Sequence, residues 1–88
     1  MKFAIMYLMY FVYIVECMDG SLYTGITTDL HRRMAEHAEG VASRYTRARK
    51  FKCLRYSETA KNRATASQRE YEIKQLSKRA KEALCTTK

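Results

Sequence analysis

The 88-residue sequence contains no proline and only three glycines, Gly20, Gly25 and Gly40. Glycine adopts backbone conformations that other residues avoid, so each glycine in a chain this poor in them should mark a special position. Cysteine is scarce too. The three cysteines lie far apart and form neither a CxxC pair nor a cluster with histidine, which argues against a structural zinc site. Reduced thiols and a cytoplasmic location are the simplest interpretation.

No hydrophobic run is long enough to cross a bilayer. The longest, residues 3–15, falls short of the about 20 residues that a membrane helix needs, and no small-x-small cleavage site of a signal peptide follows it. We therefore expect no membrane partner. We interpret residues 1–8 as a dispensable apolar extension, residues 9–85 as one domain and residues 86–88 as a tail.

Acidic residues are also few. The chain has 17 Lys and Arg against 9 Asp and Glu, and this net charge of +8 favours anionic partners such as nucleic acid, anionic lipid or an acidic protein. Residues 44–56 contain arginines, lysines and aromatics but no acid. Arginine forks bind phosphates and aromatic rings stack on unpaired bases, whereas a merely solvated basic face usually carries compensating acids. We predict contacts to nucleic acid, DNA rather than RNA, from Arg44, Tyr45, Arg47, Arg49, Lys50 and Lys52.

The pattern predicts the order strand, strand, helix, strand, helix, with a short final helix. Asp19-Gly20 between two β-rich runs predicts a hairpin. The expected fold is a small α/β (α+β) domain, in which helices flank a three-stranded mixed or antiparallel sheet. The expected elements are strands 10–17 and 21–26, a helix from Thr28 or Asp29 to Glu39 with Gly40 after its end, a loop over 43–52, a strand over 53–58, a helix from Asn62 to about Lys78 and a last helix over 79–84.

The first predicted helix carries charge on its apolar side. Arg33 and His37 share the core-facing stripe with Leu30 and Met34, whereas Glu36 is expected to be an ordinary solvated residue. A buried charge is costly unless it is paired, so we expect Arg33 and His37 to look into a groove. The alternatives are that Arg33 pairs with a carboxylate for structure only, and that His37 is a structural hydrogen-bonding residue.

The second predicted helix has the same feature. Glu70 shares its apolar side with Ala66 and Ile73. A carboxylate on the apolar side of a helix needs a cation nearby, which would be either Arg33 or a metal ion. One carboxylate can suffice for a hard divalent ion, because such an ion keeps several waters and also binds substrate phosphates.

These residues stand in an order and spacing that resembles the GIY-YIG nuclease domain, especially its small stand-alone bacterial members, over about residues 9 to 85. Phe11-Val12-Tyr13 matches the first motif and Tyr23-Thr24-Gly25 the second; Arg33, His37 and Glu70 follow at the family's spacing. Three positions depart from the family pattern. Phe11 replaces a glycine, Ile26 stands where some members have lysine, and Glu82 replaces an asparagine.

The resemblance implies a DNA endonuclease that depends on a divalent metal and acts on branched, nicked or single-stranded substrates. It implies a site on the sheet face built from Tyr13, Tyr23, Arg33, His37 and Glu70. We expect Glu70 to bind one Mg²⁺ or Mn²⁺ and Arg33 to clamp a phosphate oxygen. Tyr13 is the expected base, with a pKa lowered by Arg33 and the metal, and Tyr23 orients water or phosphate.

His37 would relay a proton or hold the phosphate, and Gly25 would permit close approach of backbone or substrate. A DNA- or RNA-binding module that is weakly active or has no catalytic activity is the alternative function. A homodimer or a larger repair complex is left open as a partner.

The active-site hypothesis depends on the pairing of the first two strands. A two-residue loop at Asp19-Gly20 would place Tyr13 and Tyr23 on opposite faces of the sheet. An odd loop, such as Asp19-Gly20-Ser21, or a bulge with Gly20 at positive φ would place them on the same face. Tyr13 would then pair with Thr27 and Tyr23 with Cys17. A shared active site requires the second arrangement.

Overall fold

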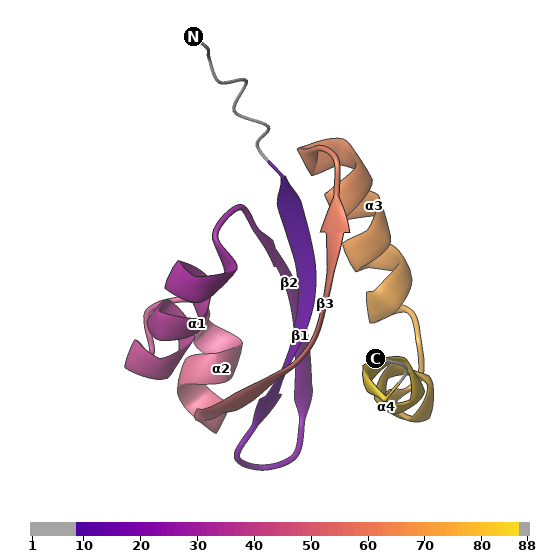
Figure 1. The fold of residues 1–88 in the computed structure, drawn as a ribbon. Helices are drawn as coiled ribbons and strands as arrows, with labels where there is room; N and C mark the ends of the chain where they lie inside the picture. The colour runs from indigo at the N-terminus through magenta and orange to yellow at the C-terminus, as the bar shows by residue number, and fades with distance from the viewer. Residues whose placement is uncertain (1–8, 87–88) are drawn as a thin grey trace, which may run out of the picture.

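A three-stranded antiparallel sheet forms the centre of the computed structural model, which describes residues 9–86 (Figure 1). The strands are β1 (Tyr10–Cys17), β2 (Leu22–Thr27) and β3 (Phe51–Ala60), and their order in the sheet is β2-β1-β3. The predicted α+β class is thus confirmed, with an antiparallel rather than a mixed sheet. The expected extension over residues 1–8 and the last two residues of the tail lie outside the described part.

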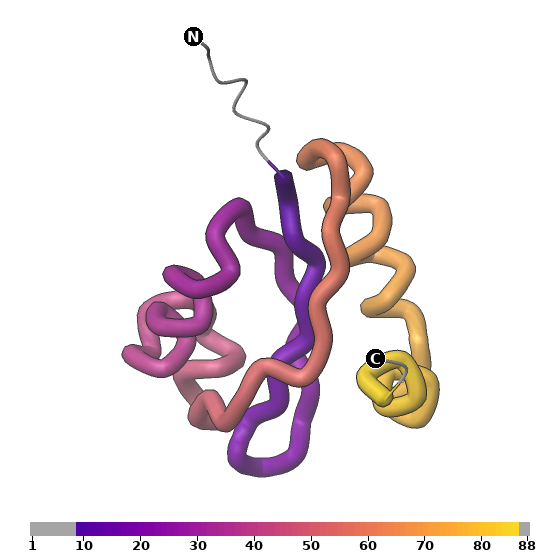
Figure 2. The backbone as a smooth tube through the Cα atoms, viewed as in Figure 1, coloured from indigo at the N-terminus to yellow at the C-terminus, as the bar shows by residue number. Residues whose placement is uncertain are grey.

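Within the described part of the chain, four helices cover the two faces of this sheet. They are α1 (Leu30–Glu39), α2 (Arg44–Arg49), α3 (Arg63–Lys74) and α4 (Lys78–Cys85). Helices α1 and α2 lie on one face and α3 and α4 on the other, as the backbone trace also shows (Figure 2). Among residues 9–86, no helix is long and apolar enough to span a membrane.

Local capping explains where three of the helices begin. The Asp29 side chain accepts a hydrogen bond from the Arg32 N–H at 3.0 Å and starts α1, and Asn62 does the same for α3 through the Thr65 N–H at 2.8 Å. Gly40 follows α1 with φ of 79°. Ser77 caps α4, so the helix predicted from Asn62 to about Lys78 ends earlier, at Lys74, and the final helix predicted over 79–84 is confirmed as α4.

Residues 44–49 correct a second prediction, because they form helix α2 and not a loop. Ser43 caps α2 by accepting the Thr46 N–H at 3.1 Å. The segment has no apolar stripe, and Thr46 is its one buried residue. The third strand is also longer than expected and extends over Phe51–Ala60. It starts directly after α2 and leaves no room for the predicted loop.

The two faces of the sheet differ in chemistry. Val12 and Ile14 of β1 pack with Ala66 and Ile73 of α3 into an apolar core. Side chains of a strand alternate, so Tyr13 lies on the opposite face, toward α1 and α2. The buried residues of α1 and α2 are polar ones, a histidine and a threonine. Three residues of the site expected from the sequence, Tyr13, Tyr23 and His37, lie together on this second, polar face.

The β1–β2 pairing satisfies the requirement for a shared active site. Tyr13 pairs with Gly25, and Tyr23 pairs with Val15, which is two residues from Tyr13 and therefore on its face. The turn makes this possible, because Gly20 has a φ of 85° and its N–H bonds to the Cys17 carbonyl at 2.9 Å. The loop thus has three residues, as required. The expected partners, Thr27 and Cys17, were wrong by two residues because the loop starts at Met18 and not at Asp19.

Candidate active site

Tyr13 and His37 form the buried centre of the polar face. Tyr13 is 2% exposed and His37, in the last turn of α1, is 1% exposed. The Tyr13 hydroxyl lies 2.8 Å from His37 Nε2, and the rings meet edge to face with centroids 5.6 Å apart. Two polar side chains buried this deeply need each other as hydrogen-bonding partners.

The second nitrogen of His37 continues the hydrogen-bonded chain. Its Nδ1 lies 2.8 Å from Thr46 Oγ1, which in turn lies 2.9 Å from Ser43 Oγ. Burial, and then the charge of Arg33, lower the pKa of His37, so the imidazole is neutral at pH 7. One ring nitrogen of a neutral histidine donates and the other accepts. The chain from Tyr13 through His37 to Thr46 can therefore pass a proton in either direction.

Tyr23 lies against the same histidine from β2. Its ring centroid is 5.6 Å from that of His37 and 5.6 Å from that of Tyr45, which belongs to α2. Tyr23 is only partly buried, unlike Tyr13. Helix α2 thus covers the site and leaves Tyr23 as its tyrosine nearer to solvent. Tyr13 and Tyr23 thus lie in one cluster, as the active-site hypothesis requires, and both rings contact the ring of His37.

Arg33 is the cation of the site and has a carboxylate partner of its own. Arg33 Nη1 lies 2.7 Å from Glu36 Oε1, and both side chains are about one-third exposed. The expectation that Glu36 is an ordinary solvated residue was therefore wrong: one turn of helix brings it back to Arg33. A fork that is held on one side keeps its remaining N–H groups for another anion.

The environment of the Tyr13 hydroxyl corrects a further expectation. Burial raises the pKa of Tyr13, and Tyr23 and Glu70 raise it further, whereas the charge and hydrogen bonding of Arg33 lower it. Burial prevails, because Tyr13 is almost fully enclosed while Arg33 shares its charge with Glu36. The expected lowered pKa of Tyr13 is thus wrong for the protein alone, and its hydroxyl stays protonated at neutral pH.

Glu70 belongs to α3, which covers the other face of the sheet, and its charge contributes to the raised pKa of Tyr13. Its carboxylate lies 3.1 Å from Lys74 Nζ and its side chain is 23% exposed. Lys74, and not Arg33, is therefore its cation within residues 9–86. The described residues contain no group of three or more His, Cys, Asp or Glu side chains that could hold a metal. A lone carboxylate still fits Mg²⁺ or Mn²⁺, which fill their coordination with waters and substrate phosphates.

Position 25 requires a glycine for a packing reason that could not be predicted from the sequence. A Cβ at this position would lie 2.5 Å from the Tyr13 hydroxyl oxygen and 2.7 Å from Tyr13 Cζ. The absent side chain therefore makes room for the Tyr13 ring, which the hydrogen bond to His37 holds in place. The close approach expected at Gly25 is that of a neighbouring tyrosine.

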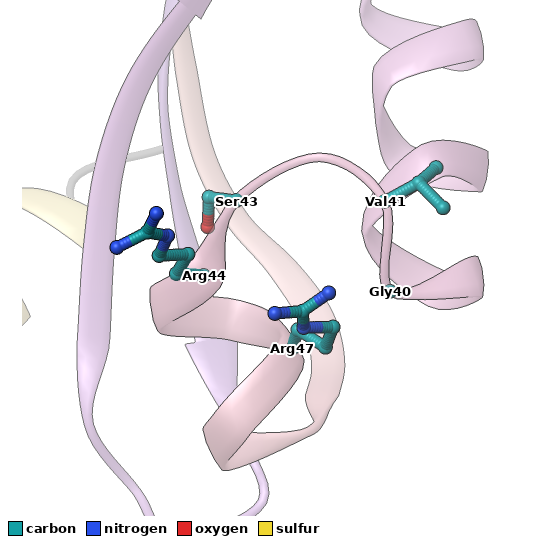
Figure 3. A pocket seen from close by; sticks show the side chains of 5 residues that line it. All are labelled: Gly40, Val41, Ser43, Arg44 and Arg47. Carbon is teal, nitrogen blue, oxygen red and sulfur yellow. The ribbon is translucent and has the colours of Figure 1, made fainter.

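The predicted nucleic-acid-binding residues divide into two groups. Arg44 and Arg47 extend from α2 beside the loop of residues 40–43 and line a cavity of about 540 Å³ (Figure 3). Together with Lys50, they form no ion pair within residues 9–86. Arg49 instead lies over the Tyr45 ring at 4.2 Å and pairs with Asp19. The remaining residue, Lys52 of β3, pairs with Glu16 of β1.

One departure from the family pattern lies away from the site. Glu82, which replaces an asparagine, accepts a hydrogen bond from Arg55 at 2.8 Å, and Arg55 also binds Glu16. Glu82 belongs to α4, on the other face of the sheet from Tyr13 (Figure 1). It fastens α4 to β3 and does not enter the cluster around His37.

Two residues of the cluster around His37 were not predicted from the sequence. The Thr46 hydroxyl is hydrogen-bonded to His37 Nδ1, and Phe51 stacks on the His37 ring with centroids 6.0 Å apart. A usable signal existed only for Thr46. Ser43 stands three residues before it, the spacing at which a serine caps a helix, and the cap would have placed a helix where a loop was predicted.

Comparison with known proteins agrees with this fold. Residues 9–83 match the family model described as the GIY-YIG catalytic domain. A UPF0213 protein of Halobacterium salinarum is 51% identical over 76 residues, which cover 86% of this chain and 99% of that protein. A UPF0213 protein of Desulfotalea psychrophila is 54% identical over 76 residues, covering 85% of this chain and 69% of the relative.

A solved structure supports the same assignment. The solution NMR structure of a UPF0213 protein from Bacillus halodurans is 46% identical, covers 91% of this chain and 85% of its own, and aligns with a TM-score of 0.58. The fold and the tyrosine-containing cluster define a nuclease-like domain. The chain belongs to the GIY-YIG family, as the sequence resemblance predicted.

Proposed function

We propose that this protein is an endonuclease that depends on a divalent metal ion and hydrolyses phosphodiester bonds in DNA. The observation that carries the proposal is the convergence on the Tyr13 hydroxyl. His37 binds it directly, and Tyr23, Arg33 and Glu70 all act on it electrostatically. A site with two hydroxyls, a fixed cation and a carboxylate has the groups that phosphodiester hydrolysis needs.

Tyr13 and His37 act as one unit in this proposal. The attacking water gives its proton to the Tyr13 oxygen while the Tyr13 proton passes to His37 Nε2, 2.8 Å away. The pair then ends with a neutral tyrosine and a charged imidazole, so the raised pKa of Tyr13 is no obstacle. Tyr23, the more exposed tyrosine, orients the water or the phosphate, and Arg33 binds a non-bridging oxygen with the N–H groups that Glu36 leaves free.

Glu70 holds the single metal ion, Mg²⁺ or Mn²⁺. When bound, the ion neutralises phosphate charge and assists the leaving oxygen. Lys74 is the ion-pair partner of Glu70 within residues 9–86, so a bound ion would compete with Lys74 for this carboxylate. Arg44, Arg47 and Lys50 bind the substrate backbone, so affinity should fall steeply with salt and depend little on sequence.

The test is a cleavage assay on branched, nicked and single-stranded DNA, with RNA of the same sequence, in Mn²⁺ and in chelator. Wild type should cut at least one DNA substrate, and Glu70→Gln and Arg33→Ala should cut far more slowly. Lys74→Gln is the matched control, because it breaks the same ion pair as Glu70→Gln but leaves the carboxylate. If the wild type binds DNA tightly and cuts none of these substrates, the protein is a binding module and the proposal fails.

A further inference from the structure

A second cleft borders the candidate active site at the end of β2. It measures about 310 Å³ and has Thr27 and Thr28 on its wall, with Arg32 and Arg33 from α1 and Arg63 from the start of α3. Among the described residues that line it, none is acidic. Arg33 also acts on the Tyr13 hydroxyl, so the cleft and the catalytic cluster share one side chain.

The positive charge of this cleft is not balanced within the fold. Glu36 serves two of its arginines, Arg33 at 2.7 Å and Arg32 at 3.7 Å. The Arg63 side chain forms no hydrogen bond or ion pair with any residue in the 9–86 range. Three guanidinium groups with one carboxylate between them attract an anion. Their planar forks suit the oxygens of a phosphate.

The cleft and helix α2 lie toward opposite ends of the site. Tyr45 of α2 packs on Tyr23 near the start of β2, and Arg49 reaches Asp19 in the hairpin turn. The cleft instead begins where β2 ends, at Thr27. Leu22 and Thr27 are five residue steps apart, which is about 17 Å at about 3.3 Å per residue. One strand of a duplex carries a phosphate about every 3.4 Å of helix axis, so a strand that runs along this length presents several phosphates to the site.

We propose that Arg32 and Arg63 bind backbone phosphates on one side of the scissile phosphate, while α2 binds those on the other side. This inference rests on the proposed function, and it makes the substrate more specific. The enzyme takes a strand that continues in both directions from the cut, and it cleaves internal bonds in preference to bonds near an end.

The first test measures binding alone, in chelator and without catalysis. Fluorescence anisotropy with a labelled single-stranded 20-nucleotide DNA gives the slope of log affinity against log salt between 50 and 200 mM. Each phosphate contact on a single strand contributes about 0.7 to this slope. Arg63→Ala should lower the slope by about 0.7, and Arg32→Ala/Arg63→Ala by about twice as much. Arg63→Lys should keep most of it.

Arg79→Ala is the matched control. Arg79 is an exposed arginine of α4, on the other face of the sheet, and forms no ion pair within the described chain. Arg79→Ala removes the same charge as Arg63→Ala, but at a position far from the cleft. If the cleft is the binding site, the salt slope of Arg79→Ala should stay at the wild-type value. Equal slopes for wild type and Arg63→Ala, or equal losses for Arg63→Ala and Arg79→Ala, would overturn the proposal.

The second test follows cleavage in Mn²⁺ on a 20-nucleotide strand and on strands shortened from either end. Arg63→Ala should reduce kcat/KM on the full-length strand but have no effect on a strand shortened from the end that occupies the cleft. An equal effect on both would contradict the assignment. The two hypotheses fail separately: if wild type cleaves none of the branched, nicked and single-stranded substrates, the proposed function is refuted, whereas cleavage with an unchanged salt slope in Arg63→Ala refutes only the cleft.

Discussion

Replacing Gly25 by alanine tests how the tyrosine is held in the site. The new Cβ would lie 2.5 Å from the Tyr13 hydroxyl oxygen, 2.7 Å from Cζ and 3.2 Å from Cε2. Tyr13 cannot move aside freely, because it is 2% exposed and hydrogen-bonded to His37. Overpacking of a well-packed interior costs about 1–3 kcal/mol. We expect Gly25→Ala to lower the free energy of unfolding by that amount.

The cause of this loss can be isolated with a double-mutant cycle. Tyr13→Phe removes the closest contact, but it also leaves a His37 nitrogen without its partner, which costs about 1–3 kcal/mol. In the Tyr13→Phe background, Gly25→Ala should therefore cost less than in the wild type, with a coupling of about 0.5–3 kcal/mol. The ring carbon contacts remain, so the relief is partial.

Urea denaturation of the four proteins measures this coupling. Gly40→Ala is the control, because Gly40 has a φ of 79° and lies by the side chain of Arg47, away from Tyr13. It should destabilise the protein without any coupling to Tyr13→Phe. If Gly25→Ala is as stable as the wild type, or if its cost adds fully to that of Tyr13→Phe, the reasoning about this contact is refuted.

Three further predictions concern single side chains. Burial and the charge of Arg33 lower the pKa of His37, so the unfolded chain binds this proton more readily and stability should fall as pH drops below about 6.5. His37→Gln should lose that part of the pH dependence in urea melts at pH 7.5 and 5.5, and an identical dependence in both proteins would count against it. Thr24 Oγ1 is buried without a hydrogen-bond partner among residues 9–86, so Thr24→Val should stabilise the protein by about 1 kcal/mol, and a lower melting temperature would contradict this. Lys50 has a φ of 68°, a strained value for a residue with a side chain, so Lys50→Gly should gain about 1 kcal/mol in stability yet bind DNA more weakly, and a loss of stability would refute the strain.

Short-range chemistry made much of the fold predictable. Asp19-Gly20 marked the hairpin, and Asp29 and Asn62 marked helix starts, because each feature depends on neighbouring backbone groups alone. Helix α2 could not be found from its apolar pattern, because its one buried side chain, Thr46, is polar and is held by His37 from another helix. Its stability comes from a tertiary contact, and the charged sequence gives no sign of that contact.

The site was predictable wherever charge interrupts an apolar stripe. Arg33 and Glu70 stood out for that reason, but their actual partners did not. Glu36 and Lys74 each lie about one helical turn further along the same helix and form the ion pairs that the structure describes. The pKa of Tyr13 could not be predicted either, because it depends on how deeply α1 and α2 bury the ring.

Single-turnover cleavage by wild type, Glu70→Gln and Lys74→Gln tests the central claim most directly. The substrate is whichever branched, nicked or single-stranded DNA the wild type cuts fastest in Mn²⁺, with binding measured in parallel. The account predicts that Glu70→Gln cuts about 10²-fold more slowly or worse at unchanged affinity, since it loses the stabilisation of transition-state charge. Lys74→Gln should cut at least as fast as the wild type. Equal rates for Glu70→Gln and the wild type, or equal losses in both variants, would contradict it.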